Sequence, residues 1–205
     1  MNDNFFHWAF VLIFISFTIV RAYYQRMASR SRGGVQYKEG KLHIALRLIF
    51  GIPFMLLLVA FMARPDILSW ARLDFPGWLQ WLGVFLGLAS LPLIIWVQQV
   101  LGSNFSTTLH IRDEHTLVTG GPYRWVRHPM YTVLYLHFIS IFLLSQNWFV
   151  GGVFLIALTL IVILRIRNEE AAMIEKFGEG YRAYMLRTGR FLPRFGSGLR
   201  ARLDM

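Results

Sequence analysis

Hydrophobic residues in this chain lie in long, nearly uninterrupted blocks, not at the regular spacing of amphipathic helices or strands in soluble proteins. The blocks are separated by polar stretches and cover residues 5–22, 43–63, 77–101, 130–145 and 149–165. A helix needs about 20 apolar residues to cross a bilayer, and the first three blocks reach that length. The pattern therefore predicts an all-α, polytopic membrane protein with about five transmembrane helices.

The last two blocks are shorter than the others, and only Gln146, Asn147 and Trp148 separate them. So short a connection predicts that the two helices form a tight helical hairpin. The connection carries no charge, which suits the non-cytoplasmic side of the membrane.

The chain has 205 residues and a formal net charge of +10, a balance that raises the question of nucleic-acid binding. The position of the charges argues against it, because Lys and Arg gather in residues 21–41, in residues 112–127 and from residue 165 onward. The opposite ends of the apolar blocks carry only Arg64 and Arg72, offset by Asp66 and Asp74. This is the positive-inside pattern of a membrane protein, with the N-terminus outside and the C-terminus in the cytoplasm. We therefore expect the chain to contact membrane lipids and to bind no nucleic acid.

Three polar stretches share the predicted cytoplasmic side: residues 22–42, 102–129 and 166–205. Lipid headgroups alone account for the basic composition of the first stretch, whose purpose the sequence leaves open. In the third stretch apolar residues recur at helical spacing from Ile174 to Tyr184, which predicts a cytoplasmic amphipathic helix after the fifth block. Thr188-Gly189, followed by Pro193, is expected to end that helix.

The segment Arg127-His128-Pro129 stands directly before the fourth block. Proline suits the first turn of a helix, so Pro129 is predicted to open this helix with His128 at its N-cap. The amide groups at a helix start attract anions, and Arg127 and His128 strengthen that tendency. The alternative is an interfacial belt of basic and aromatic residues at headgroup depth, which we keep for Arg124.

A second group of charged residues lies where the fifth block ends. Arg165 and Glu169 are four residues apart and share one face of a helix. An ionisable pair at membrane depth usually faces the bundle interior or a wet cavity, although a surface salt bridge has the same spacing. His110 and His115 are badly spaced for a metal, and the chain has no cysteine, so no metal site is expected.

Taken together, these segments resemble the isoprenylcysteine carboxyl methyltransferase family of integral membrane enzymes, in its prokaryotic form. The resemblance covers about the last hundred residues. The motifs that carry it are GSNFS at 102–106, HTLVTGGPYRWVRHPMY at 115–131, RNEE at 167–170, FGEGYRAY at 177–184 and Leu192-Pro193. Residues 1–101, which match the family only in their hydrophobicity, are predicted from the apolar blocks to form three transmembrane helices with a basic loop at 22–42. Residues 102–205 would form the methyltransferase region, with a cofactor-binding loop, the hairpin and the C-terminal helix.

The resemblance also implies a cofactor, S-adenosyl-L-methionine, with S-adenosyl-L-homocysteine as its product. The residues carried over to the cofactor pocket are His110, His115, Thr116, Leu117, Val118, Tyr123, His128, Pro129, Met130, Tyr131 and Glu169. Arg165 would bind the carboxylate of the substrate, and Arg165 and Glu169 are the implied catalytic residues. The sequence leaves open whether Arg165 or Arg167 takes the substrate-facing position.

The implied reaction is methyl transfer to the carboxylate of a lipophilic, isoprenylcysteine-like substrate at the cytoplasmic membrane interface. The substrate would enter from the bilayer and the cofactor from the cytoplasm, with no obligate protein partner. An alternative keeps the cofactor and methylates an amine of a phospholipid or small lipophile. Two further alternatives are an enzyme like the sterol reductases, which are much longer, and a non-catalytic lipid-binding membrane protein.

Overall fold

The computed structural model describes residues 2–30, 52–102 and 116–194, and these residues fold almost entirely into helices. The long helices are α1 (Asn2–Arg30), α4 (Gly77–Leu101), α5 (Pro129–Ser145) and α6 (Trp148–Arg187). The shorter ones are α3 (Ile52–Ala63) and the 3₁₀ helices η2 (Pro65–Ala71) and η4 (Gly121–Arg124). The described residues pair as β-structure only in two isolated bridges, which confirms the predicted all-α class.

Three helices of the described part are long and apolar enough to cross a membrane: α1 within Asn4–Met27, α4 and α6. The pair α3 and η2 meets at an angle of 109° and passes the same test only when both helices are taken together. Helix α5 is apolar but has only 17 residues. The structure therefore contains three candidate spans, or four with the bent pair, and five crossings remain a prediction. Residues 43–51 of the predicted second block lie outside the described part.

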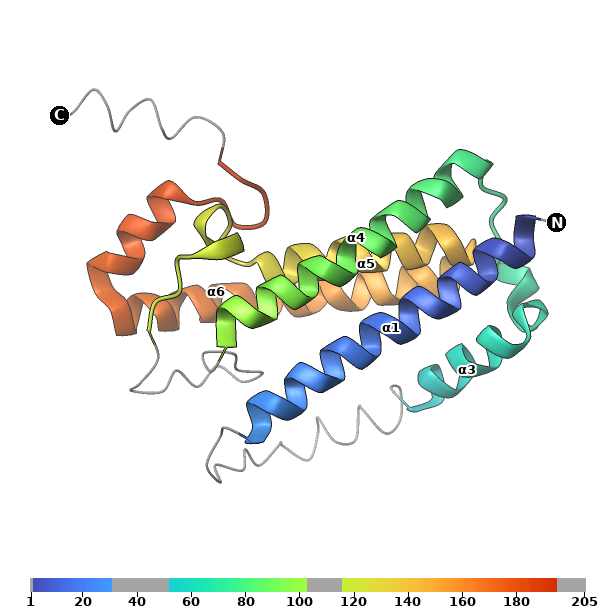
Figure 1. Cartoon of the computed structure of the whole chain (residues 1–205), viewed down its shortest axis with the longest axis horizontal. Helices are drawn as coiled ribbons and strands as arrows, with labels where there is room; N and C mark the ends of the chain where they lie inside the picture. The colour runs from blue at the N-terminus through green and yellow to red at the C-terminus, as the bar shows by residue number, and fades with distance from the viewer. Residues whose placement is uncertain (1, 31–51, 103–115, 195–205) are drawn as a thin grey trace.

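Helices α1, α4, α5 and α6 run alongside one another as a bundle (Figure 1). Two glycines one turn apart, Gly83 and Gly87, let α4 approach α5 closely. Ser140 of α5 donates a hydrogen bond of 2.6 Å to the carbonyl of Gly83. A Cβ on Gly87 would lie 2.5 Å from Ser140 Oγ and 2.7 Å from Ile13 of α1. Small residues at these positions bring three helices together, as is common in membrane bundles.

Two polar residues, Gln146 and Asn147, form the short connection between α5 and α6. Gln146 ends α5 in the left-handed region, with φ of 47°. Asn147 is the N-cap of α6, and its Oδ1 accepts a hydrogen bond of 3.0 Å from the amide of Val150. Its Nδ2 donates to the carbonyl of Leu68 at 2.9 Å, which ties η2 to the same place. These contacts orient α6 so that it returns along α5.

Helix α6 continues well past the apolar block and bends only at Gly178, which has φ of 53° and ψ of −128°. The residues predicted to form a cytoplasmic amphipathic helix, 174–184, therefore belong to this extension of α6 and lie on both sides of the bend. Helix α6 ends at Arg187, where the amide of Thr188 donates to the carbonyl of Tyr184, so the predicted end is confirmed. The extension lies at the end of the bundle opposite the N-terminus (Figure 1).

Candidate functional site

The segment before α5 has the predicted arrangement. Pro129 occupies the first turn of α5, and His128 is its N-cap. Just upstream, Gly121 has φ of 56° and begins η4, and a Cβ there would lie 2.7 Å from Val100 of α4. The glycine lets the chain turn tightly against α4, and the proline starts the next helix without leaving an unpaired amide.

The residues after α6 bind along this same segment. The amides of Arg127 and His128 donate to the carbonyls of Gly189 and Arg190 at 2.8 and 3.0 Å. The amide of Gly189 donates in turn to the carbonyl of Trp125 at 3.2 Å. A side chain at position 189 would collide with the backbone of residue 192. The chain after α6 therefore holds the start of α5 in place through backbone hydrogen bonds.

A buried carboxylate lies under this contact. Glu170, which is 4% exposed, accepts a hydrogen bond of 3.2 Å from Arg127 Nε. Arg190 approaches the same carboxylate with Nη2 at 2.5 Å, and the pairing raises the pKa of Arg190. Arg127 also donates to the carbonyls of Met185 and Thr188. One carboxylate thus joins α6, the start of α5 and the C-terminal segment.

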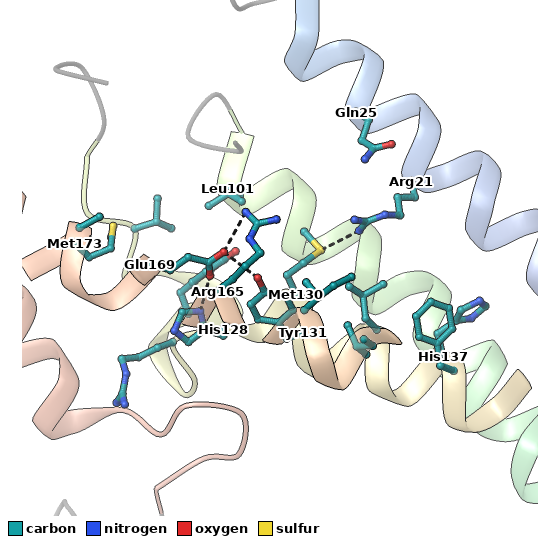
Figure 2. Close-up of a pocket in the computed structure, with 18 of the residues that line it drawn as sticks. Arg21, Gln25, Leu101, His128, Met130, Tyr131, His137, Arg165, Glu169 and Met173 are labelled. Atoms are coloured by element: carbon teal, nitrogen blue, oxygen red, sulfur yellow. Dashed lines mark hydrogen bonds and ion pairs between the residues drawn. The ribbon is translucent and has the colours of Figure 1, made fainter. Parts of the chain in front are cut away.

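The neighbouring carboxylate, Glu169, faces a different group of residues (Figure 2). Its Oε1 accepts a hydrogen bond of 2.8 Å from the hydroxyl of Tyr131 and lies 3.3 Å from Arg165 Nη2. Its Oε2 lies 3.7 Å from Nδ1 of His128. The two adjacent glutamates therefore have different environments. Glu170 is buried and forms ion pairs with two arginines, whereas Glu169 borders open space.

That open space is a cavity of about 790 Å³ between α1, α5, α6 and the segment 116–118. Its polar end is formed by the charged and aromatic residues around Glu169. Its apolar end extends between α1, α5 and α6 and is lined by Phe14, Phe17, Leu134, Phe138, Phe154 and Leu158. A volume of this size, with few polar groups and many aromatic ones, is typical of small-molecule sites.

Most of the residues implied by the resemblance meet at this cavity. Those that line it are Thr116, Leu117, Val118, Tyr123, His128, Met130, Tyr131, Arg165 and Glu169. Pro129 is buried behind the wall and does not line it. Arg167 is exposed, whereas Arg165 lines the cavity, so the geometry favours Arg165 as the inward-facing arginine. His110 and His115 lie outside the described residues.

The sequence did not identify several other residues of the wall. Arg21 and Gln25 come from α1, and His137 comes from the middle of α5. His137 is 1% exposed and stacks on Phe17 with ring centroids 3.8 Å apart. Arg21 lies near the end of the first apolar block, where the positive-inside pattern alone accounts for its charge. The sequence pattern of one helix alone does not indicate which of its faces will line a cavity formed with other helices.

The side chains at the polar end suit a ligand that is both charged and aromatic. Glu169 offers a carboxylate to a cation, and Tyr123, Tyr131 and Phe177 offer ring faces. Burial raises the pKa of Tyr123, as do Tyr184 and Glu169, so its hydroxyl stays neutral. His128 Nε2 is buried and has no hydrogen-bond partner among the described residues, with the nearest Glu170 oxygen 3.5 Å away. These groups can accommodate a small ligand that carries both charged groups and a ring.

Comparison with known proteins gives a match in this part of the chain. Residues 81–175 match the sequence model of the isoprenylcysteine carboxyl methyltransferase (ICMT) family. The protein-S-isoprenylcysteine O-methyltransferase of Mus musculus is 35% identical over 104 residues, which are 50% of this chain and 36% of that enzyme. The uncharacterized protein YpbQ of Bacillus subtilis is 32% identical over 96 residues, or 46% of this chain and 57% of that protein. The match leaves out α1 and α3, and the chain aligns with only part of each relative.

Proposed function

We propose that this chain, whose residues 81–175 confirm the resemblance to the isoprenylcysteine carboxyl methyltransferase family, is a methyltransferase embedded in the membrane. It uses S-adenosylmethionine to methylate the carboxylate of a lipophilic, isoprenylcysteine-like acceptor. One observation carries this proposal. A single cavity joins a polar end, built from the family's motif residues, to an aromatic, apolar end between helices of the bundle.

The polar end has groups for each part of the cofactor. S-adenosylmethionine, when bound, supplies an electrophilic methyl group, and S-adenosylhomocysteine is the product. Glu169 is suited to accept hydrogen bonds from the ammonium or the ribose hydroxyls, and the rings of Tyr123 and Tyr131 stabilise positive charge. His128, at the start of α5, is suited to an anionic carboxylate.

The acceptor carboxylate has to be positioned for methyl transfer but does not have to be activated by a base. A carboxylate is ionised at neutral pH and is already a nucleophile, so no general base is required. We assign this group to Arg165, which lines the cavity, and the apolar walls would exclude water from the reacting atoms. The aromatic end of the cavity suits the hydrocarbon part of an acceptor that arrives from the bilayer.

The proposed orientation has five crossings, the N-terminus outside and the active site at the cytoplasmic face. The cavity is lined in part by Phe177, Tyr181 and Tyr184 of the α6 extension. That extension lies at the end of the bundle opposite the N-terminus (Figure 1). The opposite end holds η2 and the N-terminus of α1, where His7 Nε2 lies 2.9 Å from the carbonyl oxygen of Met62. Arg72 pairs with Asp74 at this end, so the charges there are balanced.

The test is transfer of a labelled methyl group from S-adenosylmethionine to N-acetyl-S-farnesyl-cysteine by the purified chain. We expect a product whose label is released by base, because a methyl ester hydrolyses and a methylamine does not. A base-stable product formed from a lipid amine would support the amine acceptor instead. No transfer to either class of acceptor, by protein that remains folded, would contradict the proposal.

A further inference from the structure

Helix α1 lies outside the region that matches the family, yet one face of it forms a wall of the cavity. Phe14, Phe17, Arg21 and Gln25 line the cavity and recur at the three- and four-residue spacing of a single helix face. The two aromatic residues lie within the apolar block, whereas Arg21 lies near its end and Gln25 just beyond it. The face therefore changes from apolar to polar along the cavity, as an amphiphilic ligand does.

Arg21 points from α1 toward Met130 and Tyr131 (Figure 2). Its Nη1 lies 3.7 Å from Met130 Sδ, and a thioether sulfur is a weak acceptor. Among the described residues, Arg21 has no carboxylate partner.

The charges along the cavity do not cancel. Arg127 is paired with Glu170, and Arg165 is paired with Glu169. Arg190 shares Glu170 with Arg127, so neither glutamate is available to a third arginine. A guanidinium that is half-buried at membrane depth costs free energy unless an anion accompanies it. Among the described residues, these three arginines and Arg21 thus outnumber the two glutamates, and Arg21 has no carboxylate of its own.

We propose that Arg21 binds the carboxylate of the methyl acceptor, from the wall of the cavity opposite α6. This inference rests on the proposed function and names the residue that selects an anionic acceptor. The acceptor's hydrocarbon chain then lies along Phe17 and Phe14, on the same face of α1. The charge of Arg165, which can contact the same carboxylate, is offset by Glu169, so Arg21 supplies the uncompensated positive charge that distinguishes an acid from its ester.

The test compares Arg21→Gln and Arg21→Lys with Arg26→Gln, a matched control. Arg26 lies on the same helix but is exposed and outside the cavity, and its replacement changes the net charge equally. Binding of N-acetyl-S-farnesyl-cysteine and of its methyl ester to the full-length proteins in detergent is measured by calorimetry. The ratio of the two dissociation constants isolates the contribution of the carboxylate charge from that of the hydrocarbon chain.

We expect the unmodified protein and Arg26→Gln to prefer the acid over the ester by about tenfold or more, since a charged hydrogen bond is lost with the ester. Arg21→Gln should remove most of this preference by weakening acid binding, and Arg21→Lys should retain part of it. Binding of S-adenosylhomocysteine should be the same in all four proteins, which shows that the cavity remains folded.

An equal acid-to-ester ratio in Arg21→Gln and Arg26→Gln would overturn the inference. That result would point to another anion at Arg21, such as a lipid phosphate. The measurement needs no turnover, so it remains informative if methyl transfer fails. Failure of the unmodified protein to bind S-adenosylhomocysteine would count against the proposed function. An acid-to-ester ratio that is unchanged in Arg21→Gln would count against the role of Arg21 alone.

Discussion

Replacing Glu170 by Ala should release the C-terminal segment from the start of α5. Glu170 is almost fully buried and receives both Arg127 and Arg190. The side chain of Arg127 is only 9% exposed, so the substitution leaves a buried guanidinium without its carboxylate. Removal of one partner from such a pair costs about 3–5 kcal/mol.

The loss of free energy mainly destabilises the state in which the C-terminal segment is bound to the start of α5. In that state the carbonyls of residues 189 and 190 accept hydrogen bonds from the amides of residues 127 and 128. At 1.4 kcal/mol per factor of ten, the equilibrium for opening should shift by a factor of about 140 to 3,700. Hydrogen exchange followed by mass spectrometry reports this opening at the amides of Arg127, His128 and Gly189. Their protection should fall by a comparable factor while the amides in the middle of α4 remain protected.

Glu179→Ala is the matched control, because Glu179 lies on the same helix and pairs with Arg182 at 3.1 Å. That pair is exposed, with the Glu179 side chain 91% accessible, so its loss should cost at most about 0.5 kcal/mol. If Glu170→Ala and Glu179→Ala leave the three amides equally protected, Glu170 does not hold the segment in place.

Three further predictions concern the cavity and the bundle. Tyr131→Phe removes the hydroxyl that donates to Glu169 and should weaken S-adenosylhomocysteine binding by about 5–30-fold, whereas Tyr135→Phe should not change it in the same titration. Gly87→Ala should lower the thermal midpoint, because its Cβ would lie 2.5 Å from a side chain of α5 and overpacking costs about 1–3 kcal/mol. Gly152→Ala, with nothing within 4 Å, should leave the midpoint unchanged or raise it. The methyl-transfer rate with a carboxylate acceptor should stay flat between about pH 6 and pH 9, since that group ionises near pH 4. A tenfold fall in rate per pH unit below a pKa near 9 would indicate an amine acceptor.

The helices of this protein were predictable because each depends on local composition. The apolar blocks at 77–101 and 130–145 coincide with α4 and α5 almost to the residue, and the proline rule placed His128 at the N-cap. The length of α6 was not predictable in the same way. Its apolar block ends near Arg165, but no helix breaker follows until Gly178, so the helix continues through a charged segment.

The contacts of the site were predictable only between residues that are close together in the sequence. The spacing of Arg165 and Glu169 required them to share a helix face, and the structure pairs them at 3.3 Å. The different roles of Glu169 and Glu170 depend on which side of α6 meets the chain after residue 187. Arg21 reaches the cavity because α1 packs against α4 and α5, a tertiary contact that no feature of its own sequence reveals.

The most direct test of the proposed methyltransferase is calorimetric titration of the detergent-purified chain with S-adenosylhomocysteine. The proposal predicts saturable binding to one site, weakened by at least tenfold in Glu169→Gln. Arg167→Gln serves as the control, because Arg167 is exposed on the same helix and does not line the cavity. Absence of binding at millimolar ligand, by protein whose thermal unfolding remains cooperative, would contradict the proposal.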